Sequence, residues 1–415
     1  MTDFWKGKKA LITGVTGFVG SYLAKSLLQQ GAIVYGTLQN RADCVVPKNL
    51  KDKALEERIS LCEGDLSNLY SLIRAVELCE PDVIFHLGAK SFVKESFDNP
   101  LLFAQTNCIG TANLLEAVRL RCPKTTVVFA GSSEEYGLAF STQKQYEQVK
   151  AKYQTIFPEP VSIPEMPINE NNPLRPVSPY AVSKVYGDYL FRQYNLSFGM
   201  NTIVTRAFNH EGAGRGAHFV TSVITRQVAK MKYKETDMIT IGDVTAFRDW
   251  SHVSDIIKGY QIVAEKGQPG EVYALGSKRT NSVLTFLLLA LEEAGYPVFE
   301  MSTVKGDRVI SEPARMKKIN MFGVELSAST VDQLLLTDEL SLGPEDEGLV
   351  LNTGQGRINV VFNKERFRPS DVPILLSDPS KAMALGFEVT HELRDIVRDQ
   401  LDFFFAPENR TAYSL

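Results

Sequence analysis

The chain has 415 residues, of which 44% are hydrophobic and 23% are charged, as in an ordinary globular protein. This composition excludes a disordered, collagen-like or coiled-coil chain. The 45 Lys and Arg residues against 49 Asp and Glu residues give a net charge of −4, which argues against a nucleic acid or an anionic membrane as a partner.

The chain carries no sequence signal for a membrane or for export. No apolar run approaches the roughly 20 residues that cross a bilayer, and the N-terminus lacks the hydrophobic core of a signal peptide. The five cysteines are scattered and form no CxxC pair, which is typical of free thiols in a reducing compartment. The five histidines are scattered as well, so we expect no metal site. These features predict a cytoplasmic protein.

The first half of the chain alternates between short buried strands and helices. The pattern predicts strands at 9–14, 32–38, 59–62, 82–87, 126–130 and 201–206, and helices at 20–30, 69–78, 111–121 and 179–194. Such alternation is typical of βαβ units and a parallel sheet. The predicted fold class is therefore α/β, a Rossmann-type doubly wound parallel sheet with a smaller C-terminal α/β lobe.

Two domains with two insertions are expected. Residues 1–206 should form mainly the dinucleotide-binding domain, and residues 207–415 mainly a substrate-binding lobe that is interleaved with the sheet. An insertion at about 140–167 is polar and then rich in proline. A second insertion, at about 305–363, carries an acidic segment and a glycine turn, Gly354-Gln-Gly356.

A glycine-rich loop lies between the first predicted strand and the first predicted helix. It reads Gly14-Val-Thr-Gly17-Phe-Val-Gly20. The glycines allow a tight turn and let a pyrophosphate approach the helix N-terminus, whose free N–H groups and dipole favour anions. Because the loop has the strand–turn–helix context that this function demands, we expect a dinucleotide site here rather than a bare structural turn.

The residues after the second and third predicted strands concern the adenosine end of the cofactor. No acid follows Leu38 to bind a ribose 2′-OH, and Arg41 could meet a 2′-phosphate. The sequence therefore favours NADP over NAD, with NAD still possible; the alternative is that Arg41 is a solvated loop residue. Asp65 and Leu66 fit an adenine-edge contact, or Asp65 and Ser67 could cap the next helix.

Tyr180 and Lys184 stand four residues apart, which places both side chains on one face of the helix predicted at 179–194. A nearby ammonium stabilises a phenolate and thereby lowers the pKa of a tyrosine. Such a phenol can act as general acid or base on a sugar hydroxyl or carbonyl during hydride transfer. With the glycine loop upstream, the pair predicts catalysis, although the spacing alone is common in helices.

The loop Gly131–Gly137 follows the strand predicted at 126–130, and loops at the carboxyl ends of parallel strands bind ligands. Ser132 can hydrogen-bond a substrate hydroxyl beside Tyr180. Glu134 can abstract a proton next to a carbonyl, whereas Glu135 should point the other way if the loop stays extended. The alternative is that both glutamates belong to a solvated turn.

Together these residues resemble the extended short-chain dehydrogenase/reductase family of nucleotide-sugar enzymes. Further segments resemble the GDP-mannose 4,6-dehydratase pattern within it: Arg206–Glu211, Arg215-Gly216, Phe219–Thr221, Gly242–Trp250, Phe367–Val372 and Asp378–Ala382. Two departures stand out. Ser132 replaces the usual threonine, and Phe18-Val19 replace Gln-Asp. The segments Ser132–Gly137 and Arg368–Pro373 also look like the related GDP-4-keto-6-deoxymannose reductases.

The resemblance implies a set of site residues. The catalytic residues would be Ser132, Ser133, Glu134, Tyr180 and Lys184. The cofactor would be bound by Gly14, Thr16, Gly17, Phe18, Val19, Gly20, Arg41, Asp65, Leu66, Leu87, Ala89, Tyr180 and Lys184. The nucleotide-sugar would be bound by Ser91, Asn209, Arg215, Val220, Arg248, Arg368 and Asp371. In this scheme Arg248 and Arg368 hold the diphosphate, and Asp371 accepts from the ribose hydroxyls.

The implied activity is a redox-neutral dehydration of a nucleotide-sugar, GDP-mannose or a related GDP-sugar, to the 4-keto-6-deoxy sugar. The implied assembly is a homodimer or homotetramer, in which Arg215 can reach the cofactor of a neighbouring subunit. Three alternatives stay open: a 4-keto reductase that uses the same Tyr180, an epimerase that does not require Glu134, and a cofactor-binding regulatory protein without turnover.

Overall fold

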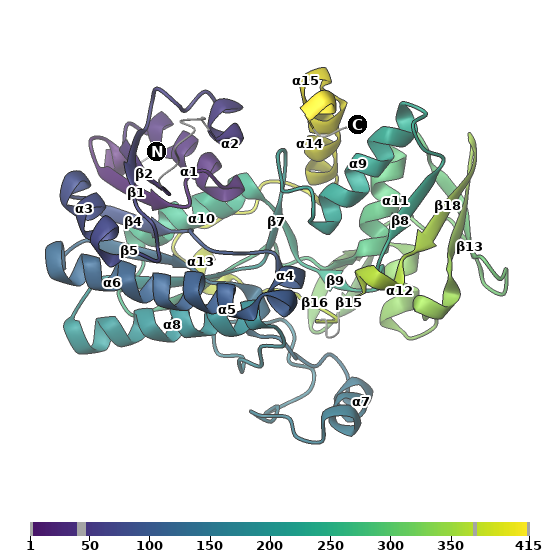
Figure 1. Ribbon diagram of the computed structural model, residues 1–415. Helices are drawn as coiled ribbons and strands as arrows, with labels where there is room; N and C mark the ends of the chain where they lie inside the picture. The colour runs from purple at the N-terminus through teal and green to yellow at the C-terminus, as the bar shows by residue number, and fades with distance from the viewer. Residues whose placement is uncertain (1–2, 40–46, 368–371, 413–415) are drawn as a thin grey trace.

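The computed structural model describes residues 3–39, 47–367 and 372–412. Figure 1 shows two lobes side by side, the first built mainly from the N-terminal half of the chain and the second from the C-terminal half. Residues beyond 206 also return to the first lobe, where they supply its last strand and two of its covering helices. Among the described residues, no helix combines the length and the apolar character needed to cross a membrane.

The first lobe is built on a seven-stranded sheet in which every pair of neighbouring strands is parallel. Its order is β11-β6-β5-β4-β1-β2-β3. The strands are β1 (Lys9–Thr13), β2 (Ile33–Leu38), β3 (Ser60–Glu63), β4 (Val83–His86), β5 (Thr126–Ala130), β6 (Thr202–Ala207) and β11 (Val272–Leu275). This confirms the predicted Rossmann-type parallel sheet. The strand β11 was not predicted.

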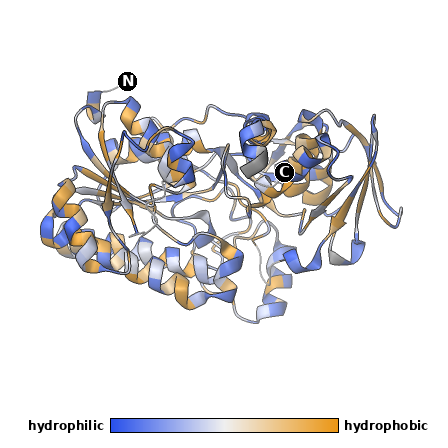
Figure 2. Cartoon of the chain, turned by 45° about the horizontal axis from the view of Figure 1, so that its top comes forward, coloured by the Kyte–Doolittle hydropathy of each residue, from blue (hydrophilic) through white to orange (hydrophobic). Residues whose placement is uncertain are grey.

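Helices cover both faces of this sheet. On one face lie α3 (Leu69–Cys79), α6 (Gly110–Arg121) and α8 (Pro179–Phe198). On the other face lie α1 (Phe18–Gln29), α10 (Val253–Lys266) and α13 (Ser380–Met383). Figure 2 shows that the strands are mainly hydrophobic, whereas the outer helices mix hydrophilic and hydrophobic residues. Burial of these strands and helix faces is the main stabilising force of the lobe.

The start of α8 is fixed by its own sequence. The Ser178 hydroxyl accepts from the Ala181 backbone N–H at 3.1 Å, and Pro179 occupies the first helical position. Gly199 ends the helix in the left-handed conformation. These signals place Tyr180 in the first turn of α8, at the edge of the sheet where β5 ends.

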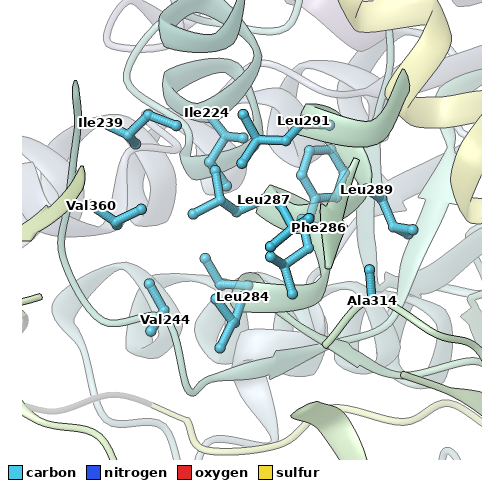
Figure 3. Packing of buried hydrophobic residues seen from close by; sticks show 14 of the residues in the cluster. Ile224, Ile239, Val244, Leu284, Phe286, Leu287, Leu289, Leu291, Ala314 and Val360 are labelled. Carbon is cyan, nitrogen blue, oxygen red and sulfur yellow. The ribbon is translucent and has the colours of Figure 1, made fainter. Parts of the chain in front are cut away.

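The second lobe contains a five-stranded sheet of order β14-β13-β17-β18-β8. Its strands are β8 (Met238–Ile241), β13 (Val298–Thr303), β14 (Val309–Ser311), β17 (Gly348–Thr353) and β18 (Gly356–Phe362). Its main helices, α9 (Val220–Lys232), α11 (Val283–Glu293) and α14 (Leu393–Phe405), pack together against it. Figure 3 shows Leu284, Phe286 and Leu287 of α11 inside this core.

The two predicted insertions occupy different positions in the fold. The segment 140–167 contains α7 (Gln143–Tyr153), which lies apart from both sheets in Figure 1. The segment 305–363 supplies β14, β17 and β18 together with β15 (Lys317–Met321), β16 (Val324–Ala328) and α12 (Thr330–Leu336). It is therefore an integral part of the second sheet rather than an appendage. The two segments meet where Lys144 Nζ lies 2.8 Å from Asp338 Oδ2.

Short elements complete the described chain. Two small pairs join the lobes, β7 (Asn209–Glu211) with β10 (Trp250–His252) in parallel and β9 (Phe247–Arg248) with β12 (Asn281–Ser282) antiparallel. The remaining α-helices are α2 (Lys48–Lys51), α4 (Val93–Asp98), α5 (Pro100–Phe103) and α15 (Pro407–Ala412). A π-helical stretch covers Ala104–Ile109, and 3-10 turns cover Asp3–Trp5, Ser133–Glu135, Pro344–Asp346 and Lys364–Arg366.

Candidate active site

A cleft of about 620 Å³ opens at the carboxyl ends of β1, β4 and β5. Residues that follow these strands line it together with the start of α8 and the segment after β6. Of the predicted site residues, the lining includes Gly14, Thr16, Gly17, Phe18, Val19, Gly20, Leu87, Ala89, Ser91, Ser132, Ser133, Glu134, Tyr180, Lys184, Asn209 and Arg215. The fold thus gathers the predicted catalytic residues and the glycine loop into one cavity.

The glycine loop has the shape that a pyrophosphate needs. Gly14 has a φ of +73°, and a Cβ there would lie 2.8 Å from the backbone of Gly88. A Cβ on Gly20 would lie 2.3 Å from the carbonyl oxygen of Gly14. Gly17 is the N-cap of α1, and among the described residues no side chain caps this helix. The first N–H groups of α1 therefore remain for an anion at the cleft, and the residues fit a dinucleotide.

The pKa of Tyr180 is raised to about 12, mainly because the side chain is buried. The charges of Glu134 and Glu135 contribute to this rise, whereas the hydrogen bond with Ser132 and the charge of Arg215 oppose it. The Lys184 ammonium donates to the Ala130 carbonyl oxygen at 2.7 Å. In this structure desolvation outweighs the charge of Arg215, so the pKa of Tyr180 lies above its ordinary value rather than below it.

The loop after β5 forms a tight turn. The Glu134 backbone N–H donates to the Ser132 hydroxyl at 3.2 Å, and the Ser132 backbone N–H donates to Glu135 Oε1 at 2.7 Å. This reciprocal cap makes Ser133–Glu135 a 3-10 turn, so the assumption of an extended loop was wrong. Ser132, Ser133 and Glu134 face the cleft, while Glu135 is fully buried and does not line it.

Two of the predicted adenosine-side residues lie beside the cleft rather than in its lining. The Asp65 Oδ1 atom accepts from the Ser67 backbone N–H and hydroxyl, both at 2.8 Å. The cap of α3 is Asn68, so the alternative of Asp65 or Ser67 as that cap is wrong. Leu66 packs against Gly110, where a Cβ would lie 2.7 Å from the Leu66 Cβ. Arg41 lies outside the described residues.

Asn209 and Arg215 extend the cleft toward the second lobe. Asn209 begins β7, and its buried Oδ1 forms no hydrogen bond among the described residues. The Arg215 guanidinium lies 3.5 Å from the centre of the Phe219 ring, and its Nε lies 3.2 Å from Glu211 Oε2. These contacts hold Arg215 beside the glycine loop, since it also lies over Phe18.

The structure does not place the four remaining predicted substrate-binding residues in the cleft lining. Val220 begins α9 and packs against the core of the second lobe, outside the cleft lining. Arg248 is buried and donates to the carbonyl oxygens of Phe247 and Val372 at 2.9 and 2.6 Å. Arg368 and Asp371 lie outside the described residues.

Several lining residues were not predicted. Asn49 in α2 donates from Nδ2 to the Thr16 carbonyl oxygen at 2.9 Å and so braces the glycine loop. Lys48, His210, Phe219 and Tyr260 also line the cleft. No local pattern marks Lys48, Asn49 or Tyr260. His210 stands in a segment that the resemblance included; burial and then the charge of Arg215 lower its pKa to about 4.

Comparison with known proteins gives concordant matches. The model of the NAD dependent epimerase/dehydratase family matches residues 10–276, and that of GDP-mannose 4,6 dehydratase matches residues 162–400. A GDP-mannose 4,6-dehydratase of Sinorhizobium fredii (strain HH103) is 30% identical, over 97% of this chain and 98% of its own. One of Yersinia enterocolitica is 31% identical, over 90% and 87%. The structure of RMD from Pseudomonas aeruginosa complexed with NADPH shares the fold, with a TM-score of 0.63, 21% identity and coverage of 96% and 99%.

Proposed function

The chain belongs to the NAD dependent epimerase/dehydratase family and is a nucleotide-sugar dehydratase of the extended short-chain dehydrogenase/reductase type, and we propose that it converts GDP-mannose or a related GDP-sugar with NADP. In this reaction the sugar is oxidised at C4, loses water across C5 and C6, and is reduced at C6. The product is the 4-keto-6-deoxy sugar, and the net oxidation state does not change.

The observation that carries this proposal is the meeting of Glu134 with Tyr180 at one cleft. Both line it, and the charge of Glu134 acts on the Tyr180 hydroxyl. A dehydratase needs two proton-transfer groups at neighbouring sugar carbons, one at the C4 hydroxyl and one at C5–H. A reductase or an epimerase needs only the first, so the carboxylate favours elimination.

Tyr180 is proposed to remove the proton of the C4 hydroxyl, with Ser132 sharing the hydrogen bond to that oxygen. Lys184 favours the phenolate through its positive charge. When bound, a nicotinamide dinucleotide supplies the hydride acceptor at C4 and the hydride donor at C6. Once C4 is a ketone, C5–H becomes acidic, and Glu134 takes that proton. The protonated Glu134, directly or through Ser133, would then protonate the C6 hydroxyl so that water leaves. The proton that Tyr180 took from the C4 hydroxyl balances the one that C5 regains when C6 is reduced.

The cofactor proposal rests on the glycine loop and on the adenosine side of the cleft. The loop and the uncapped start of α1 suit a pyrophosphate. Leu38 ends β2 without a following acid for the ribose 2′-OH, which favours NADP. Arg41 is proposed to bind the 2′-phosphate of NADP, and Asp65 and Leu66 are proposed to contact the edge of its adenine ring.

The nucleotide-sugar is proposed to run from Tyr180 toward the second lobe. The unpaired Oδ1 of Asn209 supports a sugar or phosphate contact at this point, because a buried polar atom without a partner is costly. Ser91 and Val220 would lie along the same path. Arg248 and Arg368 would hold the diphosphate, and Asp371 the ribose.

We also propose a homodimer or homotetramer that works in the cytoplasm. The outer side of α8 supports a subunit contact, because Val182, Tyr186 and Tyr189 are exposed there. In such an assembly Arg215 would reach the cofactor of a neighbouring subunit. Sedimentation of the purified protein tests the assembly, and a monomer at working concentration would contradict it.

The deciding experiment uses the purified protein with GDP-, CDP- and UDP-hexoses and without added NADPH. A product lighter by one water molecule from a GDP-hexose supports the proposal. The same loss from a UDP- or CDP-hexose would keep the dehydratase and overturn the GDP-sugar. An unchanged mass would point to epimerisation or inactivity, and activity only on a 4-keto sugar with NADPH would point to a reductase.

A further inference from the structure

The Arg215 side chain is held from several sides at the cleft. Its guanidinium carbon lies 3.5 Å from the centre of the Phe219 ring and 5.4 Å from the centre of the Phe18 ring. Arg215 Nε lies 3.2 Å from Glu211 Oε2, and this oxygen also accepts from the Thr221 hydroxyl at 2.7 Å. The guanidinium is therefore fixed in place by the chain itself, before any ligand binds.

The terminal nitrogen atoms of Arg215 are not used by the protein in this way. Neither of them forms a hydrogen bond with a residue that the structure describes, and the contact with Glu211 runs through Nε. Because Nε is buried and the residue lines the cleft, the terminal nitrogens are the part of the side chain that faces the cleft. A guanidinium offers these N–H groups as a planar fork that fits phosphate oxygens.

The local sequence brings Phe219 under Arg215. The Phe219 backbone N–H donates to the Gly216 carbonyl oxygen at 3.1 Å, which folds the chain back just before α9 begins. A Cβ on Gly216 would lie 3.3 Å from two atoms of the Phe219 ring, so glycine leaves room for the ring. Phe219 lines the cleft beside Arg215, and no step proposed above uses it.

We propose that Phe219 is a positioning residue, whose ring holds the Arg215 guanidinium so that its terminal nitrogens bind a phosphate group in the cleft. The phosphate belongs to the dinucleotide or to the nucleotide-sugar, and the inference rests on the proposed function in taking one of these as the ligand. An aromatic face attracts a guanidinium, and a side chain that is ordered in advance loses less entropy on binding. The competing explanation is apolar packing alone, for which any apolar side chain of similar size would serve.

Phe219→Leu separates the two explanations, because leucine stays apolar but has no aromatic face, whereas Phe219→Tyr keeps that face. The matched control is Phe92→Leu. Phe92 packs edge-on against Phe219, with ring centres 6.0 Å apart, but lies outside the cleft lining. The readout is calorimetric binding of NADP and, separately, of GDP to protein freed of nucleotide, so no turnover is needed. Arg215→Met and the double variant with Phe219→Leu complete the set.

We expect Phe219→Leu to weaken the binding of NADP, of GDP or of both by about threefold to tenfold, while Phe219→Tyr and Phe92→Leu bind as the parent does. The nucleotide that is affected identifies the source of the phosphate. In the Arg215→Met background, Phe219→Leu should cause no further loss, because the ring then has no cation to hold.

Two results would overturn the proposal: unchanged affinities in Phe219→Leu, or equal losses with and without Arg215. Phe219→Met takes the place of the leucine variant if that variant does not fold. A parent that binds neither NADP nor GDP would overturn the proposed ligands together with this inference. Failure of the positioning role alone is thus distinguished by normal binding in the parent.

Discussion

The Nζ atom of Lys184 lies 5.9 Å from the centre of the Tyr180 ring, yet its hydrogen bond goes to the Ala130 carbonyl oxygen. The two side chains share a helix face, as their spacing requires, but the ammonium is held by the strand end rather than by the phenol. Any effect of the Lys184 charge on the Tyr180 hydroxyl must therefore act through space. The pKa of Tyr180 is about 12 in this structure, and it must be lowered by positive charge before a phenolate can take a proton near neutral pH.

Tyr180→Phe tests the acid–base assignment. The ring remains, so the packing of Tyr180 against Phe103 should persist, but the group that moves the C4 proton is lost. We expect turnover to fall by roughly two to four decades, the usual contribution of general acid–base catalysis. The measurement is kcat beside a thermal unfolding curve. Full activity with an unchanged melting curve would rule out Tyr180 as the acid–base group.

The cofactor preference can be tested by calorimetry on protein freed of nucleotide. The absence of an acid after Leu38, with Arg41 close behind it, predicts tighter binding of NADP than of NAD. Arg41→Ala should weaken NADP binding roughly tenfold or more, the worth of a charged hydrogen bond, and leave NAD binding nearly unchanged. A clear preference of the parent for NAD would contradict the role given to Arg41.

A buried carboxylate joins the two lobes and should make stability depend on pH. Asp255 in α10 accepts from the Thr390 hydroxyl at 2.7 Å and from His391 Nδ1 at 3.0 Å, just before α14 begins. Burial raises the pKa of Asp255, but these hydrogen bonds more than offset it, so the net pKa lies below 3.8. A carboxyl with a lowered folded-state pKa stabilises the fold above its unfolded pKa, and this stabilisation disappears as the pH falls through the folded-state pKa.

Asp255→Asn should therefore lower the free energy of unfolding at neutral pH by about 1–3 kcal/mol, because it removes a charged acceptor and leaves donors unpaired. Urea unfolding at a series of pH values checks this. The difference between parent and variant should shrink as the pH falls below 3.8. A difference that stays constant over the whole pH range would show that the charge of Asp255 contributes nothing.

The strands of the first lobe up to β6 could be predicted, because parallel strands buried on both faces read as short apolar runs between helices. The six predicted strands all form, each within one residue of its predicted ends. In the second lobe, β18 alternates buried and exposed residues and pairs with β8, far away in sequence. Such pairing leaves only a weak local signal, which explains why the strands of the segment 305–363 were not predicted.

Within the site, the sequence motifs predicted which side chains line the cleft but not which residues these side chains contact. The pattern around Ser132 identified Glu134, whereas the inward turn of Glu135 depends on the 3-10 geometry and on Arg206 from β6. The bond from Asn49 to Thr16 likewise depends on tertiary packing. Interactions of this kind join residues far apart in the chain, so local spacing does not encode them.

The sharpest separation of dehydratase from reductase comes from Glu134→Gln. Glutamine keeps the shape of the side chain at the cleft but cannot take the C5 proton, which becomes acidic only after C4 is oxidised. Tyr180 and Lys184 are untouched, so oxidation at C4 should still occur and reverse. We therefore expect the variant to stop the loss of water from a GDP-hexose while it shows a transient NADPH absorbance. The matched control is Glu135→Gln, which sits in the same turn but outside the cleft lining and should still eliminate water. Two results together would contradict the dehydratase assignment. The parent would never eliminate water, and Glu134→Gln would reduce a 4-keto sugar with added NADPH as fast as the parent does. A reductase would give these results because it requires no base at C5.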